Sequence, residues 1–249
     1  MTERARVLVV VGTRPEAIKM APVVTALNAP SRVGRIETRL ALTGQHTTLV
    51  KQVLTAFELT ADYDLNIMKP GQTLYDVAHG CLDGLGPVVR DFNPDIVLVQ
   101  GDTATVFWAS LVAFFERTRV GHVEAGLRSG DKWAPYPEEI FRRLTDQLTD
   151  LYFAPTGAAR DNLLAEGTNE TQVFVTGNTV VDALLAVRDT AWTVSDPQTR
   201  AVLEADGRIA LLTAHRRESF GEPLEAVFSA VTQLVEEVPD LQVIYPVHP

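Results

Sequence analysis

Ionisable side chains of types that exchange protons gather between residues 121 and 143. His122 and Glu124 follow an apolar run that we expect to be a buried strand, and Glu138 comes just after a proline at an expected helix start. Open α/β sheets bind ligands where strands end and helices begin. The segment therefore indicates acid–base chemistry at one sheet edge, and the alternative is an ordinary strand end followed by an acidic helix cap.

A third carboxylate, Asp102, follows another apolar run and is expected at the same edge as Glu124 and Glu138. Carboxylates gathered with arginines suit proton transfer on an anionic substrate, because their mutual repulsion can raise one pKa into a useful range. Structural alternatives stay open for two of them. Asp102 could cap the helix that follows it, and Glu124 could pair with Arg128 at the surface.

A charged cluster, Thr213-Ala-His-Arg-Arg-Glu218, follows a later apolar run. Its composition argues against a buried core position for His215 and favours a role for this imidazole in a site. The histidines show no His-x-His or other metal-ligand spacing, so we expect no metal site.

The loop after the first expected strand has the composition of an anion site. Thr13 can cap the next helix, Glu16 can return the bond, and the turn directs backbone N–H groups at the sheet edge. Arg14 and Lys19 add positive charge, which suits a diphosphate or a carboxylate. The loop matches neither the dinucleotide-binding glycine pattern nor a Walker pattern, so it predicts neither NAD nor ATP. The alternative is a capped helix with solvated basic residues.

Strands and helices alternate along the first part of the chain. Segments that read as strands lie at 6–12, 36–42, 64–68, 95–100, 120–123, 151–154 and 172–176, and the runs at 6–12 and 95–100 are typical of strands covered on both faces. Helical spacing follows most of these segments. The alternation predicts an α/β fold with a doubly wound, mostly parallel sheet.

The rhythm changes near residue 178, where a helix and then a polar stretch separate two strand series. The second series has a strand, a helix and a strand, at 208–212, 223–238 and 241–247. We therefore expect two domains, 1–178 with the acid–base carboxylates and 179–249 with the second strand series. Two parallel strands cannot close a core, so we expect the second domain to be truncated.

Composition excludes several classes of protein. The 249 residues include 22 basic and 32 acidic side chains, for a net charge of −10, and no run of Lys and Arg could follow a phosphate backbone. Nucleic acid is therefore not expected as a partner. The single cysteine, Cys81, fits a reducing compartment. No apolar run suits a membrane span or a signal peptide, which predicts a soluble, cytoplasmic protein.

Five motifs, in this order along the whole chain, resemble those of the non-hydrolysing UDP-N-acetylglucosamine 2-epimerases. They are Gly12-Thr-Arg-Pro-Glu16, Gly101-Asp-Thr103, His122-Val-Glu-Ala-Gly-Leu-Arg128, Pro137-Glu-Glu139 and Thr213-Ala-His-Arg-Arg-Glu-Ser219. The resemblance implies two Rossmann-like domains in the arrangement of the GT-B glycosyltransferases, with a nucleotide-binding role for 179–249 and the active site between the domains. It also implies a homodimer at full length, a place in cell-envelope polysaccharide synthesis, and no metal or nicotinamide cofactor.

The resemblance further implies a reaction and a set of site residues. UDP-N-acetylglucosamine and UDP-N-acetylmannosamine would interconvert by elimination and re-addition of UDP through 2-acetamidoglucal. The implied catalytic residues are Asp102, Glu124, Glu138 and His215, without an assignment of the carboxylates to faces of the sugar. Arg14, Lys19 and His215 match positions that handle the diphosphate. Substrate contacts are implied for Arg14, Lys19, Gln45, His122, Arg128, Arg142, Arg216 and Glu218.

The sequence departs from the family pattern in two places. Phe141 stands where the family usually has asparagine, so local hydrogen bonding should differ. Some members are activated by substrate at a second site, and there Gln45 remains while Thr48 and Gly71 replace family residues.

Three alternatives in function stay open: a hydrolysing 2-epimerase, a GT-B glycosyltransferase, and a non-catalytic fragment that binds a sugar nucleotide. The set of carboxylates argues against the transferase. Because the second domain is expected to be short, we also expect the 249-residue chain alone to show no epimerisation.

Overall fold

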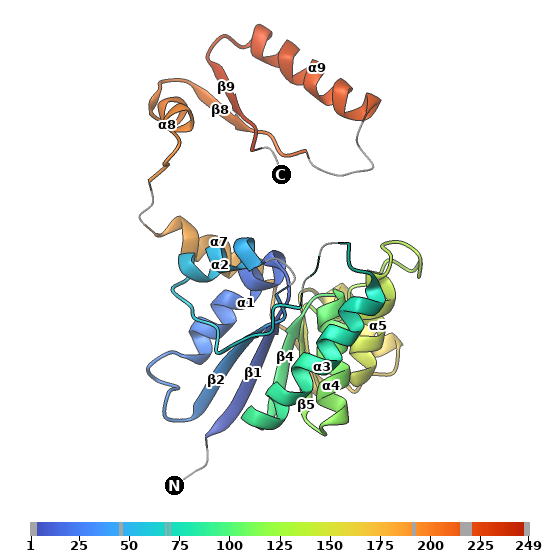
Figure 1. Cartoon of the computed structure of the whole chain (residues 1–249). Helices are drawn as coiled ribbons and strands as arrows, with labels where there is room; N and C mark the ends of the chain where they lie inside the picture. Colours follow the sequence, from blue (N-terminus) through green and yellow to red (C-terminus); the bar gives the residue numbers. More distant parts are fainter. Residues whose placement is uncertain are drawn as a thin grey trace. The chain divides into compact units, whose positions relative to one another are not determined.

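The computed structural model describes residues 4–44, 47–67, 69, 71–190, 193–214 and 221–246. The chain divides into two compact units, Met1–Asp189 and Thr190–Pro249, and Figure 1 draws the elements of both. The first unit contains the acid–base carboxylates Asp102, Glu124 and Glu138 that the sequence predicts.

Seven parallel strands form the sheet of the first unit, in the order β3-β2-β1-β4-β5-β6-β7. The strands are β1 (Ala5–Val11), β2 (Ile36–Leu42), β3 (Tyr63–Asp64), β4 (Ile96–Gln100), β5 (Arg119–Val123), β6 (Leu151–Ala154) and β7 (Val173–Val175). The helices are α1 (Arg14–Leu27), α2 (Thr47–Ala56), α3 (Leu74–Phe92), α4 (Ala104–Phe115), α5 (Glu138–Leu148), α6 (Gly157–Ala165) and α7 (Thr179–Arg188), with the short 3₁₀ helix η1 (Glu170–Gln172) before β7. The predicted α/β fold with a parallel sheet is confirmed.

Helices cover both faces of this sheet, which explains the continuous apolar runs in its central strands. Side chains of β1 alternate between the faces: Val7 and Val9 pack with α1 and α2, whereas Leu8 and Val10 pack with α3 and α4. Helices α3, α4 and α5 lie together on one side of the strands in Figure 1. A third apolar cluster, around Leu163, packs α6 against β6.

The direction of winding reverses between β1 and β4, which are neighbours in space but separated by two strands in sequence. Strands β2 and β3 extend to one side of β1, and strands β5 to β7 extend to the other side of β4. At such a reversal, the loops beyond the carboxyl ends diverge and leave room for a ligand. The loops after β1 and β4 are therefore the first place to look for a site.

Two boundaries differ from the sequence prediction. The strand expected at 64–68 ends at Asp64, and two residues later Asn66 adopts a left-handed conformation with φ of 47°, which breaks an extended strand. The boundary expected after residue 178 places α7 in the second domain. In the structure α7 packs against α1, and the first unit continues to Asp189.

The only cysteine of the sequence lies in the core beneath α3. Cys81 is fully buried among apolar side chains of α3, α4 and the sheet. Burial raises the pKa of its thiol to about 12, because a thiolate is poorly solvated there.

The second unit contains a strand–helix–strand arrangement. Strands β8 (Arg208–Leu211) and β9 (Leu241–Ile244) pair in parallel, and helices α8 (Pro197–Glu204) and α9 (Glu222–Glu237) belong to the same unit. The ring of Phe228 on α9 meets Tyr245 edge-on at 5.5 Å. Leu211 and Leu234 stay largely exposed, as expected when few elements cover a two-stranded sheet.

Across the described ranges of both units, no helix is long and apolar enough to cross a membrane.

Candidate active site at the carboxyl ends of β1, β4 and β5

A single buried carboxylate joins the loops after β1 and β4. One oxygen of Glu16 accepts a bond from the Gly12 amide at 2.6 Å. The other accepts bonds from the hydroxyls of Thr13 at 2.7 Å and Thr103 at 2.8 Å. Burial raises the pKa of Glu16, although these hydrogen bonds act in the opposite direction. Glu16 therefore ties the two loops together at the point where the winding of the sheet reverses.

The predicted cap of α1 by Thr13 is wrong in its detail. Thr13 occupies the N-cap position, but its side chain accepts no bond from the helix. Its hydroxyl donates to Glu16 instead. A carboxylate is a charged acceptor, and hydrogen bonds to charged groups are stronger than those between neutral groups.

Close packing of Gly12 brings the same loops into contact. A Cβ atom at Gly12 would lie 2.2 Å from Oγ1 of Thr105 and 2.9 Å from Oγ1 of Thr43. These two hydroxyls are 3.0 Å apart and form a hydrogen bond. A residue without a side chain is required here because the threonines fill the space.

Glu124 stands directly after β5, where its φ of 69° turns the chain out of the strand. Its Oε2 accepts bonds from Nζ of Lys19 at 2.5 Å and from Nε2 of Gln100 at 2.6 Å. Only 13% of the Glu124 side chain is exposed. The alternative pairing with Arg128 does not occur, since Arg128 binds other acids. Glu124 is a carboxylate held by one cation and one amide at the sheet edge.

Asp102 follows β4, next to β5, and pairs with Arg142 of α5. The same guanidinium lies 3.4 Å from Oε2 of Glu139, which also accepts a bond from the Ser129 amide at 3.0 Å. Glu139 is fully buried. Asp102 does not cap α4, whose N-cap is Thr103. Arg142 thus joins Asp102 to the first turns of α5.

Glu138 is the first residue of α5 and is partly exposed, one position before the buried Glu139. The amino end of a helix favours a negative charge, so this location suits a carboxylate. Arg142 lies one turn further along α5, which associates Glu138 with the Asp102 side of the site.

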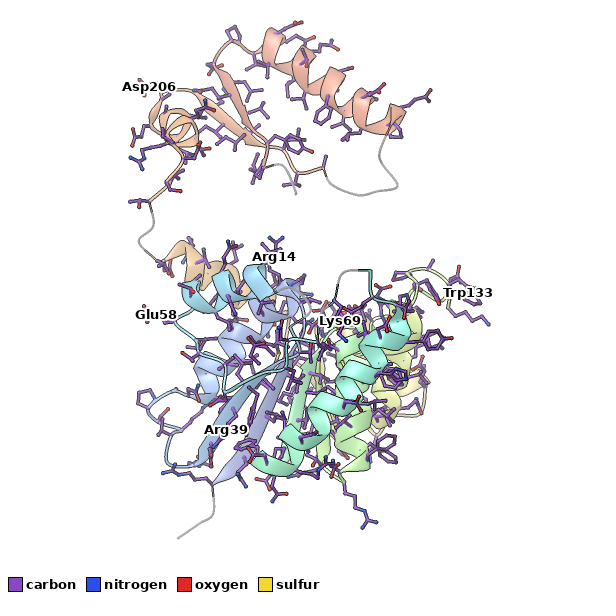
Figure 2. The ribbon with its side chains drawn as sticks, in the orientation of Figure 1. Arg14, Arg39, Glu58, Lys69, Trp133 and Asp206 are labelled. Atoms are coloured by element: carbon purple, nitrogen blue, oxygen red, sulfur yellow. The ribbon has the colours of Figure 1, made fainter. Side chains whose placement is uncertain are left out.

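Arg14 is exposed at the start of α1, and Figure 2 shows it beside α2 and α7. It lines a groove of about 430 Å³ together with apolar residues of α1, α2 and α7. The contact that the sequence predicts between Arg14 and a diphosphate stays a prediction.

A largely buried ionic network links His122, Asp146, Arg128 and Glu166. Nδ1 of His122 is 2.7 Å from Oδ1 of Asp146, and Nε2 of His122 is 2.7 Å from the carbonyl oxygen of Gly101. Asp146 also accepts a bond from Arg128 at 2.7 Å, and Arg128 binds Glu166 at 2.6 Å. Burial acts to raise the pKa of Asp146, but His122 and Arg128 outweigh it and hold that pKa below its usual value.

Phe141, which departs from the family pattern, packs against apolar neighbours. Its ring stacks on Phe107 with centroids 5.5 Å apart. Phe141 also lines an apolar groove of about 710 Å³ with residues of α3 and the loop before α5, including Trp133. Figure 2 shows Trp133 at the outer edge of that loop.

Several predicted site residues cannot be located. Gln45, His215, Arg216 and Glu218 lie outside the described residues. Within the described ranges, no three His, Cys, Asp or Glu side chains gather in a way that could hold a metal ion.

Sequence analysis assigned no site role to Gln100, Glu139 and Asp146. Gln100 could have been found as a polar residue at the end of a buried strand. Glu139, Arg142 and Asp146 recur at intervals of three and four residues, which places them along one face of a helix.

The fold and this arrangement of charges define a Rossmann-like α/β protein with a candidate site of paired carboxylates and cations at the carboxyl ends of its strands. The model of the UDP-N-acetylglucosamine 2-epimerase family matches residues 28–249. The chain belongs to this family, and the resemblance seen in its motifs is confirmed.

Individual relatives agree with this assignment. The chain is 49% identical over 248 residues to the UDP-N-acetylglucosamine 2-epimerase of Yersinia pestis, which covers 98% of this chain and 65% of the relative. It is 48% identical to the enzyme of that name from Bacillus subtilis, over 99% of this chain and 63% of the relative. The crystal structure of the Neisseria meningitidis enzyme bound to UDP-GlcNAc matches with a TM-score of 0.83 and 42% identity, over 98% of this chain and 66% of that one. The chain spans about two thirds of the length of these relatives.

Proposed function

We propose that the protein is a non-hydrolysing UDP-N-acetylglucosamine 2-epimerase, which interconverts UDP-N-acetylglucosamine and UDP-N-acetylmannosamine. The observation that carries the proposal is the pair of carboxylates Asp102 and Glu124 at the ends of neighbouring strands. Each has its own cation, Arg142 for Asp102 and Lys19 for Glu124. Membership of the family and the likeness to a relative bound to UDP-GlcNAc support the choice of substrate.

The reaction needs acid–base groups because nothing acidifies the C2 proton of the sugar directly. When the C1–O bond breaks, its electron pair leaves with UDP and positive character develops at C1. A carboxylate then takes the C2 proton, and the C–H electrons form the C1–C2 double bond of 2-acetamidoglucal. Protonation of C2 from the other face and return of UDP to C1 give the epimer. Two proton-transfer groups on opposite faces of the ring are therefore required.

We assign the acid–base roles to Asp102, Glu124 and Glu138, without an assignment to faces. The cations beside Asp102 and Glu124 hold these two carboxylates at the ends of neighbouring strands. Arg14 and Lys19 follow β1 on α1, and their positive charge would stabilise the departing diphosphate. His215 has the same expected role.

We also infer that the second unit is part of a second Rossmann-like domain of the GT-B type. Its parallel strands β8 and β9, linked through α9, are the repeating unit of such a domain. A homodimer is proposed as well. The apolar groove at Trp133 and Phe141 is a surface at which this can be tested, because exposed apolar patches mark interaction sites.

The test of function is an assay with UDP-N-acetylglucosamine, with products separated by chromatography. Two proteins are compared: the 249-residue chain, and the chain extended by the part of the Yersinia pestis relative that it does not match. We expect UDP-N-acetylmannosamine from the extended protein and no turnover from the chain alone. Release of free N-acetylmannosamine with UDP would instead identify a hydrolysing enzyme, and binding without turnover in both proteins would identify a non-catalytic module.

Single variants of the active protein test the site. Glu124→Gln and Glu138→Gln should each lower kcat by ~10²–10⁴-fold with little loss of UDP binding, because the amide cannot carry the proton. Glu58→Gln, at an exposed position of the same unit, is the control and should keep normal turnover. A Glu124→Gln protein with near-normal kcat would remove Glu124 from the mechanism.

A further inference from the structure

We propose that His122 is a positioning residue: its ring, held by Asp146, fixes the Gly101 carbonyl and thereby sets where Asp102 stands relative to Glu124. The inference rests on the proposed function for the importance of these two carboxylates. It gives His122 a role different from the substrate contact that the sequence resemblance implies.

Strand β5 holds Gly101, the residue before Asp102, through both the amide and the carbonyl of Gly101. The amide of Gly101 donates to the Val123 carbonyl at 3.1 Å, and the carbonyl of Gly101 accepts from Nε2 of His122 at 2.7 Å. Because the peptide bond is planar, fixing this carbonyl also fixes the orientation of the amide of Asp102. The loop at Gly101 turns with a φ of 87°, so ordinary strand pairing does not hold it beyond this point.

His122 and Glu124 belong to the same short segment. His122 is a residue of β5, and Glu124 follows the last residue of that strand. β5 therefore places Glu124 through its backbone and Asp102 through the His122 ring. A shift of the His122 ring would therefore change the distance between Asp102 and Glu124, although neither carboxylate is itself substituted.

The hydrogen bonds fix the orientation of the ring. A carbonyl oxygen only accepts, so Nε2 must carry a proton to bond to Gly101. Nδ1 faces an oxygen of Asp146, and this carboxylate also accepts bonds from Arg128 and from the Gly126 amide. The ring is thus held at both nitrogens, by Asp146 on one side and by Gly101 on the other.

Direct contact with substrate does not suit this side chain. His122 is completely buried, and both ring nitrogens already have protein partners at 2.7 Å. Arg128, which was also expected to touch substrate, is similarly committed to Asp146, Glu166 and the Leu127 carbonyl. Both residues act on the site through the backbone of the loops that they hold.

Two matched variants separate the bonds of the ring. The terminal amide of glutamine lies as many bonds from Cα as Nε2 does, so His122→Gln can keep the bond to Gly101 and lose the bond to Asp146. Asparagine matches Nδ1 in the same way, so His122→Asn can keep the bond to Asp146 and lose the bond to Gly101. A role in positioning Asp102 depends on the Gly101 bond alone.

We expect kcat of the active protein to fall about 10²-fold in His122→Asn and less than about 10-fold in His122→Gln, with KM changed little in either, since small displacements of reacting groups lower kcat. A residue that only supports the fold would lower the melting temperature and the activity of both variants in parallel. Equal losses of kcat in both, or wild-type kcat in His122→Asn, would overturn the proposal.

Nuclear magnetic resonance decides the same point without any reaction. In the wild-type chain, Nε2 of His122 should have the ¹⁵N shift of a protonated nitrogen, whereas an unprotonated Nε2 would refute the bond to the Gly101 carbonyl. The amides of Gly101 and Asp102 should shift and exchange faster with solvent in His122→Asn, and should stay near wild type in His122→Gln. Unchanged amides in His122→Asn would contradict the positioning role. Loss of the proposed epimerase activity in every protein would leave these results intact, so the two proposals fail separately.

Discussion

Nζ of Lys19 lies 2.5 Å from Oε2 of Glu124, although 105 residues separate them in the chain. Lys19 belongs to the helix after β1, and Glu124 follows β5, so the ion pair spans the point where the winding of the sheet reverses. Nε2 of Gln100 reaches the same carboxylate oxygen at 2.6 Å from the end of β4. Helix α1, the end of β4 and the residue after β5 thus together determine the position of one carboxylate.

The first prediction concerns this ion pair. Lys19→Met should lower kcat of the proposed epimerase by about 10–10²-fold, because Glu124 loses its cation and the departing UDP loses a positive charge. Gln100→Leu removes a bond to Glu124 without removing a charge. If the orientation of Glu124 matters, this variant should also lose activity, and normal kcat in Gln100→Leu would restrict Lys19 to the diphosphate. Lys51→Met, which breaks a more exposed ion pair with Asp64 at 3.7 Å, is the control.

The second prediction concerns the close packing at Gly12. Gly12→Ala should reduce the free energy of unfolding of the first unit by about 1–3 kcal/mol, because the new methyl group would overlap the hydroxyls of Thr105 and Thr43. Gly157→Ala is the matched control, since no atom lies within 4 Å of its added Cβ. Denaturant unfolding followed by circular dichroism measures both. Equal stability of the two variants would mean that the loop yields without cost.

The third prediction concerns acid stability. In the unfolded chain the pKa of Asp146 is near 3.9, and in the folded state it is lower. The unfolded chain therefore binds a proton at Asp146 more readily than the folded chain does. The contribution of Asp146 to stability is therefore complete above about pH 4 and is lost as the pH falls through the folded pKa. Asp146→Asn should cost about 3 kcal/mol at pH 7 and flatten the decline of stability below pH 4.

Unfolding curves between pH 2.5 and 7 provide the measurement for Asp146→Asn. Asp161→Asn is the control, because that side chain is 70% exposed and pairs only with its neighbour Arg160 in the described structure. The control should follow the wild-type pH profile. A parallel decline in Asp146→Asn and wild type below pH 4 would show that other carboxylates cause the acid sensitivity.

The fourth prediction concerns the fate of the C2 hydrogen. A proton held by a carboxylate exchanges with water, so each epimerisation through 2-acetamidoglucal should replace the C2 proton by one from solvent. Turnover in D₂O by the extended protein should give product with deuterium at C2, as measured by proton NMR. Product that retains protium at C2 would rule out the elimination route in favour of internal hydride chemistry.

Local patterns in the sequence predicted the elements of the first unit well. Runs such as 7–11 and 96–99 are continuously apolar because helices cover both faces of their strands, and this signal needs no knowledge of the neighbours. The helix at Pro197–Glu204 was missed, although Asp196 caps it and Pro197 occupies its first turn. The apolar residues of this helix are too few to predict it within a polar stretch.

The partners of the site residues could not be predicted from the same patterns. Glu124 was considered beside its near neighbour Arg128, but it binds Lys19, because strand order rather than sequence distance brings charges together. Asp146 was overlooked for a similar reason. An acidic residue on a helix is usually solvated, and only the docking of α5 on β5 buries this one against His122. Both contacts depend on tertiary structure.

The buried position of Cys81 makes this residue a natural probe of local opening at α3. A thiol reacts as its thiolate, and the raised pKa of Cys81 keeps the thiol protonated. Complete burial also keeps reagents from reaching the sulfur. Since the sequence has no other cysteine, any covalent labelling of the native protein by a thiol reagent must follow a fluctuation that separates α3 from the sheet. The rate of labelling would therefore time that fluctuation, with no probe introduced into the protein.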